Sequence, residues 1–205
     1  MKVDLILITP DAEKHIEKIG RVCYDSERFM NELSAPKFIK NLISRGHDSV
    51  LEHAQATFYI DEVSRVCANQ LVRHRIGSSY CQRSQRYCKE GNFNFYMPTS
   101  IASNTEASIR YTLTMDHLQK VYNELISLGC KPEDARMVLP NACHTQISVT
   151  MNFRALRNFF ELRCDDHAQE EIRTMAKEML KIMYKEAPSC FEDLNYKFID
   201  PRLRG

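Results

Sequence analysis

The order of strand-like and helix-like segments is the feature that most constrains how this chain folds. Residues 3–9 and 144–152 are rich in aliphatic and β-branched side chains, which favour strands. Residues 103–128 carry apolar side chains at helical spacing. Such segments are mixed along the chain without the regular strand–helix alternation that builds a doubly wound parallel sheet. The pattern therefore predicts an α+β fold, a mixed or antiparallel sheet with flanking helices.

The periodicity also predicts where the individual elements lie. Pro36 fits the first turn of a helix, and Gly46 fits its C-terminal stop. Because no repeat or linker interrupts the chain, its 205 residues are expected to form one domain, 1–205. The expected strands cover 3–9, 52–63, 92–98 and 144–152. The expected helices cover 12–24, 35–47, 63–75, 103–128, 131–140, 153–162 and 168–187.

Composition excludes several classes of protein. The formal net charge of +1 argues against a general nucleic-acid-binding protein, which carries a large basic excess. No apolar run is long enough to cross a membrane or to act as a signal peptide. The eight cysteines include no C-x-x-C pair, so no metal site is expected. We expect a cytoplasmic protein with reduced thiols.

One segment carries an uncompensated positive charge. "VRHRIGSSYCQRSQRY", residues 72–87, contains four arginines and a histidine but no carboxylate. Arginine offers a planar fork for phosphate or carboxylate, and the interleaved serine, glutamine and tyrosine side chains add directional hydrogen bonds. This mixture favours a pocket for a small anionic ligand with a heteroaromatic part. The alternatives are a solvated loop, or a single-strand-binding surface on which Tyr80 and Tyr87 stack bases.

A second polar set surrounds the helix predicted at 153–162. Asn158 follows Arg154 by four residues, so the two share a helix face, while Asn152 lies near the N-cap. Arg163 falls near the helix end, where a cation suits the helix dipole. A purely structural role for Arg163, C-terminal capping with a salt bridge to Asp165 or Asp166, stays open on sequence grounds.

Four separated blocks of the sequence carry a resemblance to a known family. Arg73-His74-Arg75, an eight-residue spacer and Ser84-Gln85-Arg86-Tyr87 match the signature of the flavin-dependent thymidylate synthases. The stretches "RGHDSVLEHAQATFYI", "DARMVLP" and "MNFRALRNFFELRCDDHAQ" resemble further blocks of that family. The resemblance covers residues 20–190.

The resemblance implies reductive methylation of deoxyuridine monophosphate (dUMP) to dTMP. It implies FAD as cofactor, NADPH and 5,10-methylenetetrahydrofolate as co-substrates, and a homotetramer with active sites at subunit interfaces. Arg163 matches the arginine that engages the uracil carbonyl and acts in catalysis. The matching dUMP positions are Gln70, Arg73, Gln82, Ser84, Gln85, Arg86, Arg136 and Arg163. The matching FAD positions are His47, Ser49, Glu52, Arg73, His74, Arg75, Gln82, Asn152, Arg154 and Asn158.

Some positions depart from the family pattern or invite another chemistry. The spacer before Ser84 is one residue longer than the commoner pattern, and Gln82 stands where many members have glutamate. A relative that binds the nucleotide without turnover therefore remains an alternative. Ser84 is expected to bind the phosphate and not to act as a nucleophile, since no base other than the flavin-assigned His74 is near in sequence. Cys81 is likewise not expected to be catalytic.

Overall fold

The computed structural model describes residues 1–200, and a four-stranded sheet organises them. The sheet has the strand order β1-β2-β4-β3. The Oγ1 atoms of Thr57 and Thr150 lie 2.9 Å apart, and Gln146 Nε2 donates to Asp61 Oδ2 over 3.2 Å. Residue numbers rise along β2 as those of the paired residues in β4 fall, so the two strands are antiparallel. The strands are β1 (Lys2–Ile8), β2 (Gln55–Ser64), β3 (Ser78–Gln82) and β4 (His144–Asn152).

The arginine-rich segment supplies the strand β3, which the sequence analysis did not expect. Asn152 N donates to Gly77 O over 3.0 Å, and Arg83 N donates to Gln146 O over 2.9 Å, so β3 is antiparallel to β4 as well. The side chains of β3 are all half-buried or exposed, which an edge strand tolerates. The predicted α+β fold, with an antiparallel sheet and flanking helices, is confirmed.

The described residues form two compact units, and β1, β2, β3 and β4 each contribute residues to both. Unit 1 comprises Met1–Lys2, Ile60–Arg73 and Cys81–Ile147. Unit 2 comprises Val3–Tyr59, His74–Tyr80 and the described residues from Ser148 on. The single domain expected over 1–205 stays a prediction, and its last five residues lie outside the described part of the chain.

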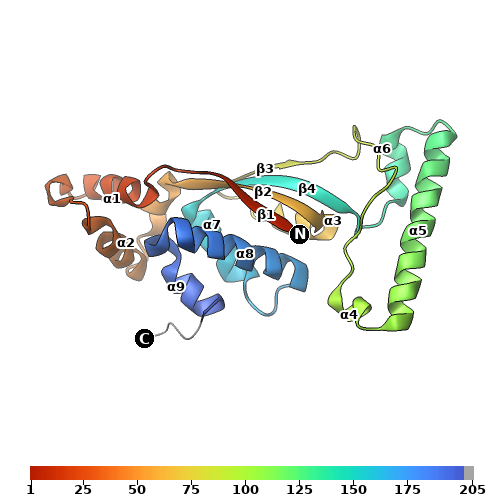
Figure 1. The fold of residues 1–205 in the computed structure, drawn as a ribbon. Helices are drawn as coiled ribbons and strands as arrows, with labels where there is room; N and C mark the ends of the chain where they lie inside the picture. Colours follow the sequence, from red (N-terminus) through yellow and green to blue (C-terminus); the bar gives the residue numbers. More distant parts are fainter. Residues whose placement is uncertain (201–205) are drawn as a thin grey trace. The chain divides into compact units, whose positions relative to one another are not determined.

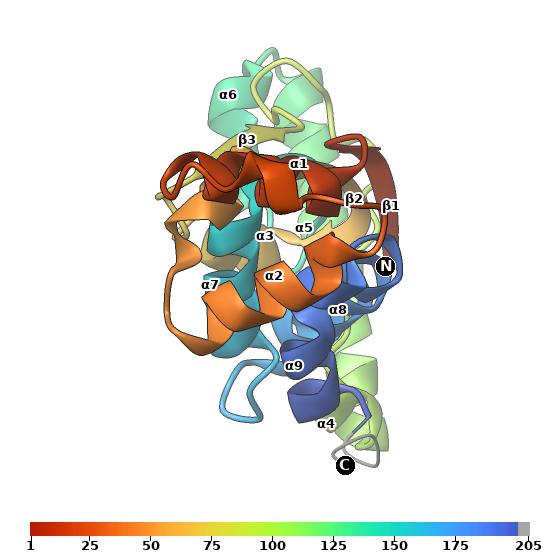
Figure 2. The ribbon, with the colours of Figure 1, turned by 90° about the vertical axis from the view of Figure 1, so that its left-hand side faces the viewer.

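Unit 2 contains the helices that cover one side of its strands. Figures 1 and 2 show α7, α8 and α9 together, with α2 next to α9. In β4, Val149 and Met151 are buried while their neighbours are half-exposed, because alternate side chains point to opposite faces. The elements are α1 (Ala12–Val22), η1 (Glu27–Phe29), α2 (Ser34–Ser44), η2 (Asp48–His53), α7 (Phe153–Arg163), α8 (Glu170–Glu186) and α9 (Pro188–Phe198).

Unit 1 is organised by the long helix α5, which holds the irregular chain after β3. Gln119 accepts from Phe93 N over 2.6 Å and donates to Glu90 O over 2.9 Å. The Tyr122 hydroxyl accepts from Glu90 N over 3.1 Å, so the chain at the buried residues Glu90 and Phe93 is held by side chains of one helix. The elements are α3 (Arg65–Leu71), α4 (Thr99–Ala102), α5 (Thr105–Ser127), α6 (Pro132–Ala135) and η3 (Arg136–Val138).

Two expectations about elements were wrong, and one helix was missed. The strand predicted at 92–98 is reduced to one isolated bridge between Phe95 and Cys143, because α5 side chains take over part of its hydrogen bonding. The helix predicted at 63–75 begins only at Arg65 and ends at Leu71, since β2 extends to Ser64, whose hydroxyl caps the helix. Helix α9, which begins at Pro188, was not predicted.

An aromatic cluster dominates the core of unit 2. The rings of Phe153 and Phe160 each pack edge-on against Phe191, with centroids 5.2 and 5.8 Å away, and all three are fully buried. We expect Phe160→Ala to lower the free energy of unfolding by about 3–5 kcal/mol, because it leaves a cavity among rings that cannot collapse. Urea denaturation measures this. Leu162→Ala, on the same helix but 56% exposed, should change stability by about 0.5 kcal/mol or less.

Candidate active site

A cavity of about 380 Å³ in unit 2 gathers several of the residues predicted to bind the flavin. Helix α7 supplies one wall and η2 supplies Glu52. Arg154 Nη1 donates to Glu52 Oε1 over 2.5 Å, which joins two positions that are far apart in sequence. The lining side chains are Glu52, Ile76, Asn152, Arg154, Ala155 and Asn158. Four of these six were predicted from the sequence, and Ile76 and Ala155 were not.

Asn152 has a structural role at the mouth of this cavity. Its Oδ1 accepts from Ala155 N over 2.8 Å and so caps α7, as the sequence predicted. Its Nδ2 lies against Gly77, where an added Cβ would approach to 2.5 Å. Gly77 also has a φ of +67°, a conformation that other residues rarely adopt. Glycine is therefore required at the turn that leads into β3.

The second feature of unit 2 is a hydrogen bond between two residues assigned to different ligands by the sequence. Arg163 Nε donates to His74 Nε2 over 2.9 Å, and the ring of Phe159 packs at 88° to the imidazole, 5.0 Å away. Burial, with the positive charge of Arg163 in second place, lowers the pKa of His74 to about 4. The imidazole is therefore neutral at neutral pH, with Nε2 as acceptor and its proton on Nδ1.

This contact replaces the salt bridge considered for Arg163. Asp165 accepts from His167 Nδ1 over 2.7 Å, and Asp166 lies 3.8 Å from Arg173. Within residues 1–200 neither carboxylate pairs with Arg163, whose terminal nitrogens form no hydrogen bond there. The purely structural salt-bridge interpretation of Arg163 was wrong.

The remaining predicted flavin positions of unit 2 lie at the surface. His47 and Ser49 flank the start of η2 and are exposed, and Arg75 is exposed between α3 and β3. Among the described residues none of the three side chains has a hydrogen bond or ion pair. They are accessible to a ligand, and the structure shows no hydrogen bond from their side chains to Arg154 or His74.

Unit 1 gathers several of the residues predicted to bind dUMP around one carboxylate. Glu133, in the first turn of α6, accepts from Arg86 Nε over 2.6 Å, and its backbone oxygen accepts from Arg136 Nε over 3.1 Å. Ser84 Oγ accepts from Arg86 N over 3.2 Å, which shapes the turn after β3. The sequence analysis assigned no role to Glu133.

Two glutamines of the arginine-rich segment contact β4 or the residue that precedes it. Gln82 Nε2 donates to Thr145 Oγ1 over 3.3 Å, and the buried Gln85 places its Nε2 3.8 Å from Cys143 Sγ. Gln70 lies near the end of α3 and Arg73 just beyond it, where the Arg73 side chain is exposed. The structure thus brings Gln82 and Gln85 to the same strand end, and it shows no direct contact between Arg73 and that group.

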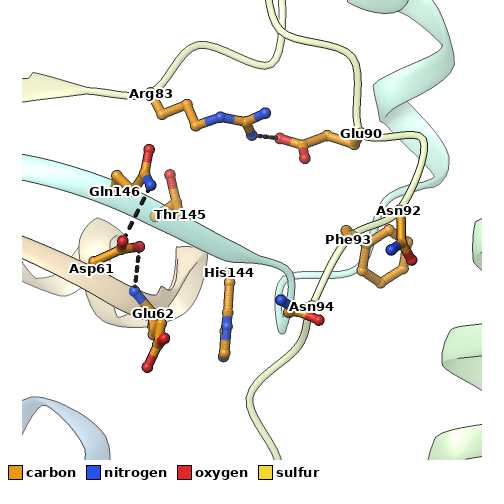
Figure 3. A pocket seen from close by; sticks show the side chains of 10 residues that line it. All are labelled: Asp61, Glu62, Arg83, Glu90, Asn92, Phe93, Asn94, His144, Thr145 and Gln146. Carbon is orange, nitrogen blue, oxygen red and sulfur yellow. Dashed lines mark hydrogen bonds and ion pairs between the residues drawn. The ribbon is translucent and has the colours of Figure 1, made fainter. Parts of the chain in front are cut away.

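A second cavity, of about 320 Å³, lies in unit 1 beside these residues. Figure 3 shows Arg83 extended toward Glu90, with which it forms an ion pair, and Gln146 turned toward Asp61. The sequence analysis assigned no role to Arg83 or Glu90. Their pairing shows that one arginine of the carboxylate-free segment is neutralised by an acid that follows it at a distance of seven residues.

Ser84, Cys143 and Cys164 show no sign of activation as nucleophiles. Ser84 Oγ contacts a backbone amide and has no histidine or carboxylate partner there. Burial raises the pKa of the Cys143 and Cys164 thiols to about 12, so neither is a thiolate at neutral pH. Across residues 1–200 there is no cluster of three metal-ligating side chains, and no helix is both long and apolar enough to span a bilayer.

Comparisons with known proteins match most of this chain to one family. A family model described as thymidylate synthase complementing protein matches residues 4–189. A flavin-dependent thymidylate synthase from Geobacter sulfurreducens is 42% identical over 201 residues, which cover 94% of this chain and 86% of the relative. Proteins of the same name are 39% identical in Clostridium tetani (94% of this chain, 86% of the relative) and 44% identical in Pyrococcus furiosus (81% and 69%).

The fold and these matches define an enzyme of the α+β class. The chain belongs to the family of flavin-dependent thymidylate synthases.

The low pKa of His74 makes a testable prediction about pH. The unfolded chain protonates this imidazole near its ordinary pKa of 6.5, whereas the folded protein does so only near 4. The folded state should therefore lose stability as the pH falls from 6.5 toward 4, and His74→Gln should remove that part of the loss. His117→Gln, at an exposed histidine of α5, is the control. An NMR titration that places His74 near 6.5 would contradict the assignment.

Proposed function

We propose that this enzyme converts dUMP to dTMP, with methylenetetrahydrofolate as carbon donor. When bound, FAD reduced by NADPH supplies the hydride that completes the methyl group. The hydrogen bond from Arg163 Nε to neutral His74 carries the proposal within the structure. This hydrogen bond orients the guanidinium of Arg163 through Nε and leaves its two terminal nitrogens for a ligand. Such donors suit a uracil carbonyl.

Arg163 is the proposed catalytic residue. A guanidinium against the uracil carbonyl stabilises the negative charge that develops as N3–H loses its proton, and the electron density moves toward C5. His74 is the positioning residue for this guanidinium, because a neutral acceptor at Nε2 holds Arg163 without taking its charge.

Unit 1 is proposed to bind the nucleotide phosphate. Arg86 and Arg136 are joined by Glu133, and Ser84 sits in the same turn as Arg86. A phosphate would compete with the Glu133 carboxylate for Arg86, whose side chain is 58% exposed. The hydroxyl of Ser84 accepts from a backbone amide through its oxygen, so its proton remains available to a phosphate oxygen.

The chemistry of the unit 2 residues fits part of a flavin cofactor. Arg154, Asn152 and Asn158 offer donors for phosphate and ring oxygens, and Ile76, which is 92% exposed, offers an apolar surface beside them. Pockets that hold drug-sized ligands measure roughly 300–1,000 Å³, so 380 Å³ suits a fragment of FAD. This supports the proposal that other subunits of a homotetramer complete the site.

The proposed activity has a direct test. The purified protein should bind FAD and turn yellow, NADPH should bleach it under nitrogen, and dUMP should alter the bleaching rate. Tritium should be released from C5-labelled dUMP only when methylenetetrahydrofolate and NADPH are both present. Failure to take up FAD would sink the proposal, whereas bleaching without tritium release would indicate a relative that binds its ligands without turnover.

The role of Arg163 is tested separately. Arg163→Ala should lower kcat for methylation by about 100-fold or more, because it removes charge stabilisation in the transition state, while FAD stays bound. Arg163→Lys should recover little of this, since lysine lacks the planar fork. Arg173→Ala, an arginine of α8 in the same unit, serves as the control. Turnover at the wild-type rate in Arg163→Ala would overturn the assignment.

A further inference from the structure

Unit 1 contains three half-buried arginines whose charges are balanced unequally. They are Arg65, Arg83 and Arg136. Arg83 forms an ion pair with the buried Glu90 (Figure 3). Among residues 1–200, neither Arg65 nor Arg136 forms an ion pair with a carboxylate. Two guanidinium groups in the same unit therefore have no carboxylate at ion-pair distance among these residues.

Of the two, Arg65 has the less satisfied guanidinium group. It is the first residue of α3, and its backbone N donates to Cys143 O over 3.0 Å. Its Nη1 is buried and has no hydrogen-bond partner within the described residues. Burial lowers the pKa of Arg65, and the charge of Arg136 acts in the same direction, whereas Glu90, which is already paired with Arg83, acts in the opposite direction. Arg65 and Arg136 are therefore close enough to repel each other.

Such an arrangement costs free energy in the ligand-free protein. A buried polar nitrogen without a partner loses its hydration without compensation, and an arginine cannot escape by losing its proton. Buried charges are normally paired, because an unpaired one is strongly destabilising. An arginine whose role was packing alone would be replaced at no loss by an apolar side chain. An anion bound beside Arg65 and Arg136 would give the buried Arg65 nitrogen the partner that it lacks.

The surroundings of Arg65 indicate which anion this is. Cys143, which accepts the backbone hydrogen bond of Arg65, also contacts the buried Gln85 through its sulfur. Arg136 shares Glu133 with Arg86. Gln85, Arg86 and Arg136 are the residues proposed above to bind the nucleotide. Arg65 is thus a further cation near members of this set, and the family resemblance did not identify it.

We propose that Arg65 is a positioning residue of the phosphate subsite, where its charge and that of Arg136 together balance the charge of a nucleoside monophosphate. A phosphate monoester carries about −1.5 to −2 charges at pH 7, which matches two guanidinium groups. This inference rests on the proposed dUMP binding. It predicts that Arg65 contributes to phosphate recognition and not to recognition of the base.

The test uses the FAD-loaded full-length protein and two probes, dUMP and deoxyuridine, which differ only in the phosphate. Arg65→Met keeps much of the side-chain volume and removes the charge. We expect it to weaken dUMP binding by about tenfold or more and to flatten its salt dependence, while binding of deoxyuridine is unchanged. Arg65→Lys, which keeps the charge, should bind dUMP more tightly than Arg65→Met. Arg110→Ala, at an exposed arginine of α5, is the control.

A thermal unfolding scan supplies a second readout, the Tm of the ligand-free protein. Loss of an arginine with a purely structural role would lower this Tm. Removal of an unbalanced buried charge should leave the Tm of ligand-free Arg65→Met equal to or above that of the wild type, while the rise in Tm produced by dUMP should shrink. A lower ligand-free Tm, or failure to fold, would overturn the proposal. So would an equal loss of dUMP and deoxyuridine binding, or no loss of either.

The failure of this inference is distinguishable from failure of the proposed function. If the wild-type protein does not bind dUMP, the proposed function fails, and the inference fails with it. If the wild type binds dUMP and Arg65→Met binds it equally well, only the role of Arg65 is overturned.

Discussion

The pairing of β4 with β2 and β3 is the constraint on which two sets of candidate site residues depend. One set lines the cavity of unit 2, and the other lies near the start of β4 in unit 1. Asn152, at one end of β4, caps α7 through its Oδ1 and donates its backbone N–H to Gly77 O before β3. Cys143, just before the other end, anchors the start of α3 through Arg65 N. The first half of β4 belongs to unit 1 and the second half to unit 2. A shift of register by one residue would turn every side chain of this strand to the other face and dismantle both sets.

Two of the four arginines in the arginine-rich segment are paired with acids that the segment does not contain. Glu90 pairs with Arg83, and Glu133 pairs with Arg86, which lies 47 positions away in sequence. Arg73 and Arg75 stay exposed and form no ion pair among residues 1–200. A count of charges within a segment therefore identifies a basic region correctly, but it cannot tell which of its cations are free to meet a ligand.

Local chemistry made part of the structure predictable from the sequence. Gly46 ends its helix with a φ of +70°, and Asn152 caps α7, because each effect needs only neighbouring residues. Strand β3 was missed because an edge strand needs no apolar alternation. The helix predicted at 63–75 was too long because its apolar stripe fits a strand end equally well. The Arg163–His74 contact spans 89 positions, so no local pattern could reveal it.

In the ligand-free protein, electrostatic interactions are unfavourable at positions that are proposed to bind ligands. His74 is held neutral beside a guanidinium, and Arg65 keeps a buried nitrogen without a partner close to Arg136. A cation fixed in advance needs no rearrangement when an anion arrives, but it destabilises the fold until then. An anion that binds only the folded state returns this free energy as stability. The proposed affinity for the nucleotide and the electrostatic cost in the ligand-free protein then have the same physical origin.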